Sequence, residues 1–185
     1  TSSYRRSFMQ EQGIGLASVR AGNVIGGGDW ADDRLIPDIL RSFENGDSVI
    51  IRNPKATRPW QHVLEPLSGY LILAQKLYKD QKEYAEGWNF GPNEQDVKPV
   101  DWILNKMIVS WPNSSWKLDE SSNPHEAGFL KLDISKSKSK LDWNPVWELS
   151  HTLERIISWH KAWLNKENMQ IVCLTEIKIY MKGMK

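Results

Sequence analysis

Four arginines occupy positions in the sequence where a phosphate-binding group would be useful. Each stands at the end of a predicted strand or at a junction between a loop and a helix. Such positions meet at the mouth of an α/β sheet, where a guanidinium can grip a phosphate through two parallel hydrogen bonds. The pattern indicates an anionic ligand, and separate surface arginines in weak ion pairs are the alternative. The four are Arg20, Arg34, Arg52 and Arg58.

A glycine loop, Gly26-Gly27-Gly28, follows the first arginine. Glycine lets backbone N–H groups approach an anion closely, so a phosphate cradle is one interpretation. The loop lacks the Lys-Ser/Thr pair of a P-loop, and its spacing differs from the dinucleotide fingerprint. A plain flexible turn therefore stays open as the other interpretation.

The histidines show no spacing typical of metal ligands, so no metal site is predicted. His125 and Glu126 are adjacent and could supply an acid–base pair or hydrogen bonds to a polar ligand. An exposed loop histidine beside a glutamate is the alternative. The remaining histidines are His62, His151 and His160.

The elements that must position these residues follow from hydrophobic patterning. Residues 16–25 are predicted to form a buried strand that runs into the glycine loop. Asp32 or Asp33 is expected to cap a helix that ends at Gly46. A second helix, beginning at Pro66, is expected to bury one apolar stripe. The stripe comprises Leu67, Tyr70, Leu71, Ala74, Leu77 and Tyr78.

Further strands and helices are predicted to alternate along the rest of the chain, which is typical of an α/β fold. A helix carrying Tyr4 and Phe8 is expected to end near Gly13. A late helix, 153–164, should have Trp163 on its apolar side. The other predicted strands are 49–51, 60–63, 88–90 and 116–118, and the other predicted helices span 99–110 and 135–141.

Composition excludes several classes of protein. The 185 residues contain 24 Lys+Arg and 23 Asp+Glu, a net charge of +1, which argues against a nucleic-acid-coating or polybasic membrane-surface protein. No apolar run is long enough to span a bilayer. The single cysteine, Cys173, favours a reducing, cytoplasmic setting. Most of the ten tryptophans are expected to pack in the core, although aromatic platforms can also stack bases or sugars.

Four segments in order resemble a known family: residues 20–30, 58–63, 88–92 and 132–145. Together they are similar to the C-terminal half of an extended short-chain dehydrogenase/reductase of the NAD-dependent epimerase/dehydratase type. The resemblance implies an α/β fold, the C-terminal part of a Rossmann-type chain with a small mixed α/β substrate-binding domain. It implies last Rossmann units at 1–30, a nucleotide-sugar-binding region at 31–165 and a tail or helix at 166–185.

The resemblance also implies an activity, the NAD-dependent 4,6-dehydration of a nucleotide sugar. CDP-glucose is the implied substrate, on the strength of residues 26–30, 51–54 and 59–63. The family's glycine fingerprint and Tyr-x-x-x-Lys pair are absent, since the fourth residue after Tyr4 is Phe8. Catalytic residues are therefore expected upstream of Thr1, which is interpreted as an interior residue of a longer, homodimeric protein.

Site residues follow from the same resemblance. Ala21 and Gly22 would line the nicotinamide of NAD, and the glycine loop would form a shaped edge of the substrate pocket. The implied substrate-binding residues are Asn23, Arg34, Leu35, Ile51, Arg52, Arg58, His125 and Glu126.

Two other functions remain open from the sequence. A 4-epimerase or reductase would keep the fold and change the chemistry, because the deciding residues lie outside this chain. A stand-alone binding module or inactive remnant would need no catalytic half. Short strands with poorly covered edges argue against that module.

Overall fold

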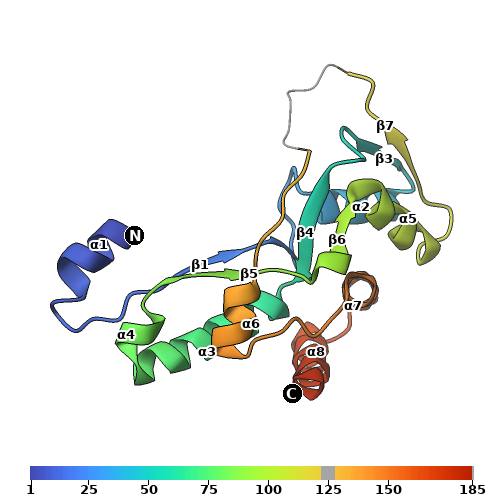
Figure 1. Ribbon diagram of the computed structural model, residues 1–185. Helices are drawn as coiled ribbons and strands as arrows, with labels where there is room; N and C mark the ends of the chain where they lie inside the picture. The colour runs from blue at the N-terminus through green and yellow to red at the C-terminus, as the bar shows by residue number, and fades with distance from the viewer. Residues whose placement is uncertain (122–127, 185) are drawn as a thin grey trace.

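The computed structural model describes residues 1–121 and 128–184 and has a mixed α/β architecture (Figure 1). Its described strands form small sheets rather than one continuous sheet, as the short predicted strands suggested. Parallel strands β1 (Ser18–Ala21) and β5 (Gly87–Phe90) pair, and so do β3 (Ser48–Ile51) and β7 (Ser115–Leu118). The third sheet has the order β2 (Asn23–Ile25), β4 (Thr57–His62) and β6 (Val97–Pro99).

The predicted strand 16–25 is divided at Gly22, where the chain changes sheets. β1 pairs with β5 before the glycine, and β2 pairs with β4 after it. The Gly22 amide still donates to the Phe90 carbonyl at 3.1 Å. A Cβ at Gly22 would lie 2.3 Å from the Pro59 carbonyl oxygen, so any side chain would collide with backbone there. Glycine therefore lets the two sheets meet closely at this point.

Helix α2 (Leu35–Asn45) has the predicted C-terminus but a different N-terminus. Gly46 caps the end with φ 73°, the left-handed conformation that glycine adopts without strain. The prediction that Asp32 or Asp33 caps the start is wrong, because Arg34 occupies the N-cap and no side chain caps the helix. Asp33 instead has φ 58°, which is outside the extended conformation that an N-cap adopts.

Helix α3 (Leu64–Lys79) forms as predicted but buries a different face. Leu71 is 74% exposed and Tyr78 is 89% exposed, so the predicted apolar stripe is wrong at these positions, whereas Tyr70 and Leu77 pack against buried core residues as predicted. The inward face instead packs closely on β5: a Cβ at Gly69 would lie 2.3 Å from the Phe90 ring. A polar network around Glu65 also turns this face inward. The buried residues of α3 are Glu65, Pro66, Ser68, Gly69 and Leu73.

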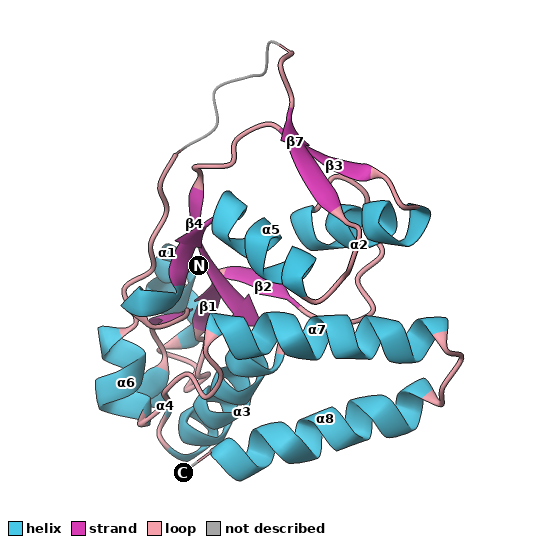
Figure 2. Ribbon diagram, turned by 90° about the vertical axis from the view of Figure 1, so that its right-hand side faces the viewer, coloured by secondary structure: helices cyan, strands magenta, loops and turns pink. Residues whose placement is uncertain are grey.

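The predicted helices 99–110, 135–141 and 153–164 form in that order, whereas two short helical segments, 81–84 and 94–96, were not predicted. α7 and α8 lie side by side as a helical pair (Figure 2). Trp163 of α7 is 40% exposed, which contradicts its predicted place on the buried side. No helix among the described residues is long and apolar enough to cross a membrane. The bounds are α4 (Gln81–Tyr84), η2 (Glu94–Asp96), α5 (Val100–Val109), α6 (Ser135–Leu141), α7 (Leu149–Leu164) and α8 (Met169–Gly183).

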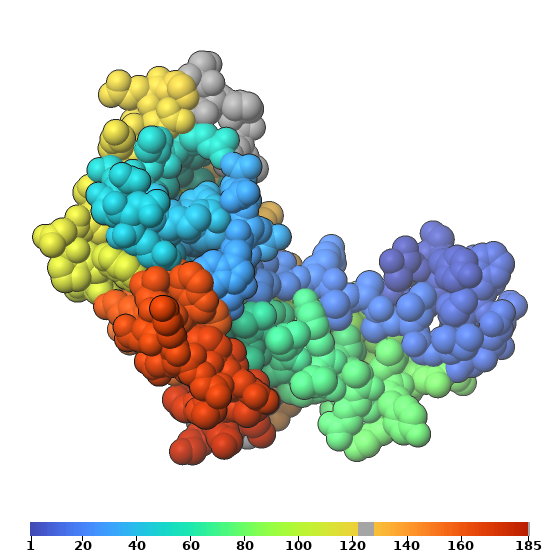
Figure 3. Space-filling view, turned by 180° about the vertical axis from the view of Figure 1, so that it is seen from behind, coloured from blue at the N-terminus to red at the C-terminus, as the bar shows by residue number. Residues whose placement is uncertain are grey.

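The first helical segment stands away from the main body (Figures 1 and 3). It comprises α1 (Ser2–Tyr4) and the π-helical stretch η1 (Arg5–Met9). Arg5 Nε donates to the Leu16 carbonyl at 2.6 Å and links the segment to the chain that leads into β1. Gly13 follows with φ 66°, at the turn where the sequence predicted the helix to stop. Tyr4 and Phe8 contact each other but are more than half exposed.

Two apolar clusters form the core. The larger cluster packs α2, α5 and α7 around β2, β3 and β4, and the smaller one packs α3, α6 and β5. Four tryptophans are buried and Trp102, Trp111 and Trp116 pack against the larger cluster, so the prediction that most tryptophans pack in the core is confirmed. Trp30 and Trp163 are 45% and 40% exposed. The buried ones are Trp60, Trp88, Trp143 and Trp159.

Candidate functional site

A cavity of about 630 Å³ opens where β2, β3, β4 and the N-terminus of α2 meet. It lies directly beyond Gly22, the residue at which the chain changes sheets. The sequence-predicted residues that line it are Gly22, Asn23, Arg34, Leu35, Ile51, Arg52 and Arg58. These residues come from four separate segments, so the fold brings together what the sequence keeps apart.

Some predicted residues do not belong to this cavity. Ala21 precedes Gly22 on β1 and is not among the lining residues, and neither is Arg20. His125 and Glu126 lie outside the described residues. The glycine loop is also absent from the lining. Gly27 instead packs on the indole of Trp159, where a Cβ would lie 2.2 Å from the ring, so the predicted role as a pocket edge is corrected to a packing role.

The floor of the cavity is apolar. It is formed by buried side chains from the strands and from the first turns of α2 and α5. Trp60 is the largest of them, and its indole nitrogen donates to the Lys98 carbonyl at 3.2 Å, which fixes the ring. Such a surface suits a flat ring or the carbon face of a sugar. The buried floor residues are Ile25, Ile36, Val49, Ile51, Ala56, Trp60 and Val100.

The rim of the cavity is charged. Arg34 stands at the start of α2, and its Nη1 lies 3.2 Å from Asp29 Oδ2. Arg52 follows β3 directly and is exposed. Arg58 lies on β4, half-buried, with its Nη1 donating to the Thr57 carbonyl at 3.0 Å. Three guanidiniums around one apolar floor form a site suited to a ligand that joins an anionic group to a flat or sugar-like group.

Several lining residues were not predicted. Asp29 and Asp33 lie in the loop between β2 and α2, and Asp38 lies in the first turn of α2, so no single periodic pattern marks the three aspartates. Asp29 and Trp60 belong to family-like segments, which could have singled them out. Asn53, in a loop after β3, carries no pattern of its own. The missed residues are Asp29, Asp33, Asp38, Asn53 and Trp60.

The far end of β4 is held by a buried histidine. His62 is 2% exposed, and its Nδ1 accepts a hydrogen bond from the Leu64 amide at 3.3 Å. Its ring meets Trp147 edge-on with centroids 4.8 Å apart. Burial, with Arg155 and His151 nearby, lowers the pKa of His62 to about 4. The imidazole is therefore neutral at pH 7 and acts as part of the core.

A buried carboxylate fixes α3 beneath the sheet. Glu65 accepts hydrogen bonds from the amides of Val146 and Trp147, at 3.0 and 2.7 Å, and from the Tyr180 hydroxyl at 2.8 Å. Burial raises the pKa of Glu65, and the amide and hydroxyl hydrogen bonds act against that shift. Residues 143–147 form a packed corner against α3, since the Trp143 indole also donates to Ser68 Oγ at 3.0 Å. This network joins α3, the corner and α8.

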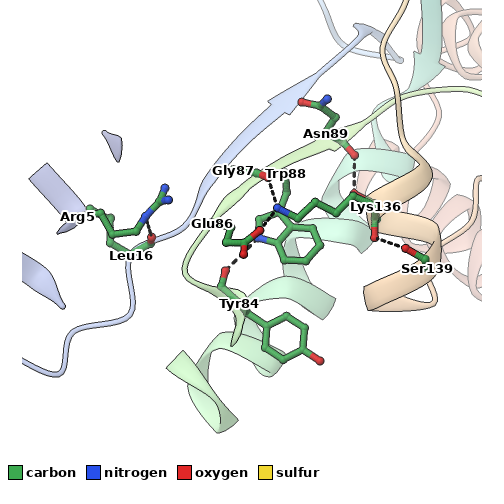
Figure 4. Close-up of polar contacts among 10 residues, drawn as sticks. Arg5, Leu16, Tyr84, Glu86, Gly87, Trp88, Asn89, Lys136 and Ser139 are labelled. Carbon is green, nitrogen blue, oxygen red and sulfur yellow. Dashed lines mark hydrogen bonds and ion pairs between the residues drawn. The ribbon is translucent and has the colours of Figure 1, made fainter. Parts of the chain in front are cut away.

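The last family-like segment has a structural role (Figure 4). Lys136 of α6 pairs with Glu86, donates to the Gly87 carbonyl at 3.0 Å and lies 4.4 Å from the Trp88 ring centroid. Ser137 Oγ donates to the Asn89 carbonyl at 2.6 Å. These contacts attach α6 to β5, and none of the residues that make them lines the cavity. Among the described residues, no group of three His, Cys, Asp or Glu is placed to hold a metal ion.

Comparison with known proteins identifies a relative. No family model matches the chain. CDP-glucose 4,6-dehydratase of Salmonella typhimurium is 58% identical over 188 residues, covering 98% of this chain and 52% of that enzyme. The chain thus spans about half the length of the relative.

Solved structures share the fold at low sequence identity. UDP-glucuronic acid 4-epimerase of Bacillus cereus, in complex with UDP-glucuronic acid and NAD, superposes with TM-score 0.67 at 20% identity over 88% of this chain and 49% of the epimerase. dTDP-glucose 4,6-dehydratase of Bacillus anthracis, in complex with NAD, gives TM-score 0.67 at 16% identity over 86% of this chain and 47% of that enzyme. The predicted fold class is therefore confirmed, for about half of such a chain.

Proposed function

Because the chain is a homologue of CDP-glucose 4,6-dehydratase with the fold of about half of an extended short-chain dehydrogenase/reductase, we propose that it supplies the nucleotide-sugar-binding half of such an enzyme. The proposed reaction of the whole protein is the NAD-dependent 4,6-dehydration of CDP-glucose. One observation carries this proposal: residues assigned to substrate binding from sequence converge on one cavity with an apolar floor and an arginine rim.

The chemistry of the cavity supports this ligand class. A nucleotide sugar combines a flat base, two sugars and a diphosphate. In the proposed arrangement Arg34, Arg52 and Arg58 bind the diphosphate, because guanidiniums form charge-assisted bidentate contacts with phosphate oxygens. Leu35 and Ile51 pack against the base and ribose, and Asn23 hydrogen-bonds the substrate beside the phosphate.

The chain offers a small part of a cofactor site. Ala21 is the last residue of β1, and Gly22, which follows it, lines the cavity. The family resemblance would place this pair beside the nicotinamide end of NAD, which would supply oxidation of the hexose hydroxyl and return of the hydride. The two residues would contact that ring at one edge only. The catalytic residues are proposed to lie in the remainder of the protein.

Exposed apolar side chains and an open strand edge support the proposal that a second half of the enzyme packs against this chain. β1 pairs with β5 on one side only among the described strands, and Val19 on β1 is 40% exposed. Leu71 and Tyr78 project from the nearby helix α3, and the first helical segment presents Tyr4 and Phe8. An open strand edge beside exposed apolar side chains is an unfavourable surface for an independent domain. These features favour a half-enzyme over a stand-alone binding module.

Ligand binding by the whole protein tests the proposal. We expect isothermal titration to show tighter binding of CDP-glucose than of UDP-glucose. Arg52→Ala should weaken CDP-glucose binding about 10-fold or more, because a charge-assisted phosphate contact is lost. Lys55→Ala is the matched control, since Lys55 is 84% exposed and pairs with Asp101 outside the lining. Equal losses in both variants, or no binding by the parent protein, would contradict the proposal.

A further inference from the structure

We infer that Asp29 is a positioning residue, which holds the guanidinium of Arg34 at the rim of the cavity ready for the diphosphate. This inference rests on the proposed function and adds a residue to the site. Asp29 lies in the loop between β2 and α2 and lines the cavity together with Arg34. It acts through the arginine rather than through a contact of its own with the substrate.

The geometry of the pair is the first observation. Arg34 Nη1 donates to Asp29 Oδ2 at 3.2 Å. The Arg34 side chain is 64% exposed, whereas that of Asp29 is 29% exposed, so the carboxylate is the better-fixed partner. Among the described residues, Asp29 is the acidic residue that forms an ion pair with Arg34. Without it, an exposed arginine would sample many rotamers.

The loop that carries Asp29 is fixed on both sides, which is the second observation. On one side Gly27 packs directly on the buried indole of Trp159. On the other side the Trp30 ring lies 4.5 Å from the Trp163 ring, centroid to centroid. The second carboxylate oxygen of Asp29, Oδ1, accepts a hydrogen bond from the Ala31 amide at 3.2 Å. The carboxylate is therefore preorganised by α7, which otherwise contributes nothing to the cavity lining.

Two opposing effects decide how Asp29 influences binding. Its negative charge repels a diphosphate, but the pair is exposed to water, where such an interaction is strongly screened. Fixing a rotamer-rich side chain before binding saves an entropic cost that corresponds to a factor of roughly 2 to 12 in the binding constant. One Nη1 hydrogen bond to Asp29 leaves the other guanidinium N–H groups available for phosphate. We therefore expect positioning to outweigh repulsion.

Asp29→Asn in the whole protein tests this directly. The asparagine keeps a carbonyl oxygen for the Ala31 amide but loses the charge that holds Arg34. We expect KM for CDP-glucose, and Kd for CDP alone, to rise about 3- to 10-fold with kcat unchanged. Asp32→Asn is the matched control from the same loop, since Asp32 is 92% exposed and outside the lining. It should leave both constants unchanged.

A double-mutant cycle separates positioning from a general effect on the loop. In an Arg34→Ala background, Asp29→Asn should cause no further loss of CDP affinity. In the parent background, Asp29→Glu should retain part of the CDP affinity that Asp29→Asn loses, because the glutamate keeps the negative charge. A loss of the same size with and without Arg34 would overturn the inference. Tighter CDP binding by Asp29→Asn would overturn it as well, because the carboxylate would then compete with the ligand.

The same experiment distinguishes this inference from the proposed function. If the parent protein binds neither CDP nor CDP-glucose, the proposed function fails. If the parent binds and Asp29→Asn matches it in KM and Kd, only the role of Asp29 fails. Thermal melting of each variant checks folding, and Asp29→Ser, which keeps an acceptor for the Ala31 amide, replaces Asp29→Asn if that variant does not fold.

Discussion

The proposed binding of the diphosphate depends on individual arginines of the cavity. Arg58 lies on β4, is half-buried and lines the cavity. In the proposed complex it contacts the diphosphate. Removing one partner of such a contact leaves the other charge unpaired, which typically costs several kcal/mol.

We therefore predict that Arg58→Ala in the whole protein weakens CDP-glucose binding by about 2 to 4 kcal/mol. Titration calorimetry measures the change. Lys98→Ala is a suitable control, because Lys98 faces Arg58 in the antiparallel pairing of β4 and β6 but does not line the cavity. An affinity that is unchanged in Arg58→Ala would remove this arginine from the site.

A second prediction concerns His62 and pH. The pKa of His62 falls from 6.5 to about 4 on folding. Between pH 6.5 and 4 the imidazole is therefore protonated in the unfolded chain and neutral in the folded chain. The contribution of His62 to the free energy of unfolding is therefore fully present above pH 6.5. It is lost as pH falls toward 4, by at most about 3 kcal/mol. The pKa of Glu65 is raised, so its contribution to the free energy of unfolding increases as pH falls.

His62→Asn tests this contribution, because the asparagine oxygen can still accept from the Leu64 amide but carries no proton. Urea unfolding of the whole protein between pH 7.5 and 4.5, an approximate range set by the shift above, gives the free energy of unfolding for both proteins. The variant should show a shallower fall in stability with decreasing pH. Parallel curves would mean that His62 already titrates normally.

Residue-scale prediction located part of the cavity lining. Arg58, predicted from its place at a strand end, and Ile51, predicted from the family resemblance, both line the cavity, and their roles in substrate binding stay predictions. The position of Asp29 relative to Arg34 could not be predicted, because it depends on a loop that is shaped by Gly27, Trp30 and α7. No local pattern in residues 26–34 reports that distant packing.

At the scale of elements, the packing of the glycine loop on α7 fixes the loop that carries Asp29 to the rim of the cavity. Trp159 occupies the space that a Gly27 side chain would need. Further along the same loop, Trp30 packs against Trp163. Asp29, which precedes Trp30, pairs with Arg34 at the start of α2. A displacement of this loop would therefore move the arginine as well as open the packing.

We predict that Gly27→Ala destabilises the whole protein by about 1 to 3 kcal/mol, the usual cost of forcing atoms into a filled core, and weakens CDP binding. Denaturant unfolding and calorimetry measure the two effects. Gly87→Ala provides the control, since a Cβ there would meet only Ser18 Oγ at an ordinary 3.5 Å. If both variants lose the same stability, the contact between Gly27 and Trp159 is not the cause.

Element positions were predictable, whereas the inward face of α3 was not. Hydrophobic spacing located α3 and α6 within two residues at their starts, since Pro66 and Ser135 mark those turns. The spacing favoured Leu71 and Tyr78 as core residues. The structure buries Glu65 instead, because its carboxylate satisfies amides and a hydroxyl brought from positions 146, 147 and 180. Such long-range hydrogen bonds leave no trace in local periodicity.

At the scale of the whole molecule, the described chain leaves much apolar surface in water. Apolar side chains are exposed on three segments: the outer face of α3, the strand β1 and the separate first helical segment. α8 adds to this surface, since Ile171 and Met181 are 61% and 62% exposed. The buried floor residues of the cavity all belong to the larger apolar cluster, so the site is built on the better-packed part of the chain.

We predict that the isolated 185-residue chain aggregates or unfolds without a sharp transition, whereas the whole protein melts cooperatively. Size-exclusion chromatography and calorimetry of both forms provide the comparison. A monomeric isolated chain with one sharp thermal transition would contradict this prediction and favour the binding-module alternative.

The most direct test of the central claim is product analysis. The whole protein is incubated with CDP-glucose and NAD, and the nucleotide-sugar product is followed by mass spectrometry and NMR. We expect loss of one water and formation of a 4-keto-6-deoxy sugar, with the reaction weakened by Arg58→Ala at limiting substrate. Recovery of CDP-glucose unchanged, or of its 4-epimer without loss of water, would contradict the claim.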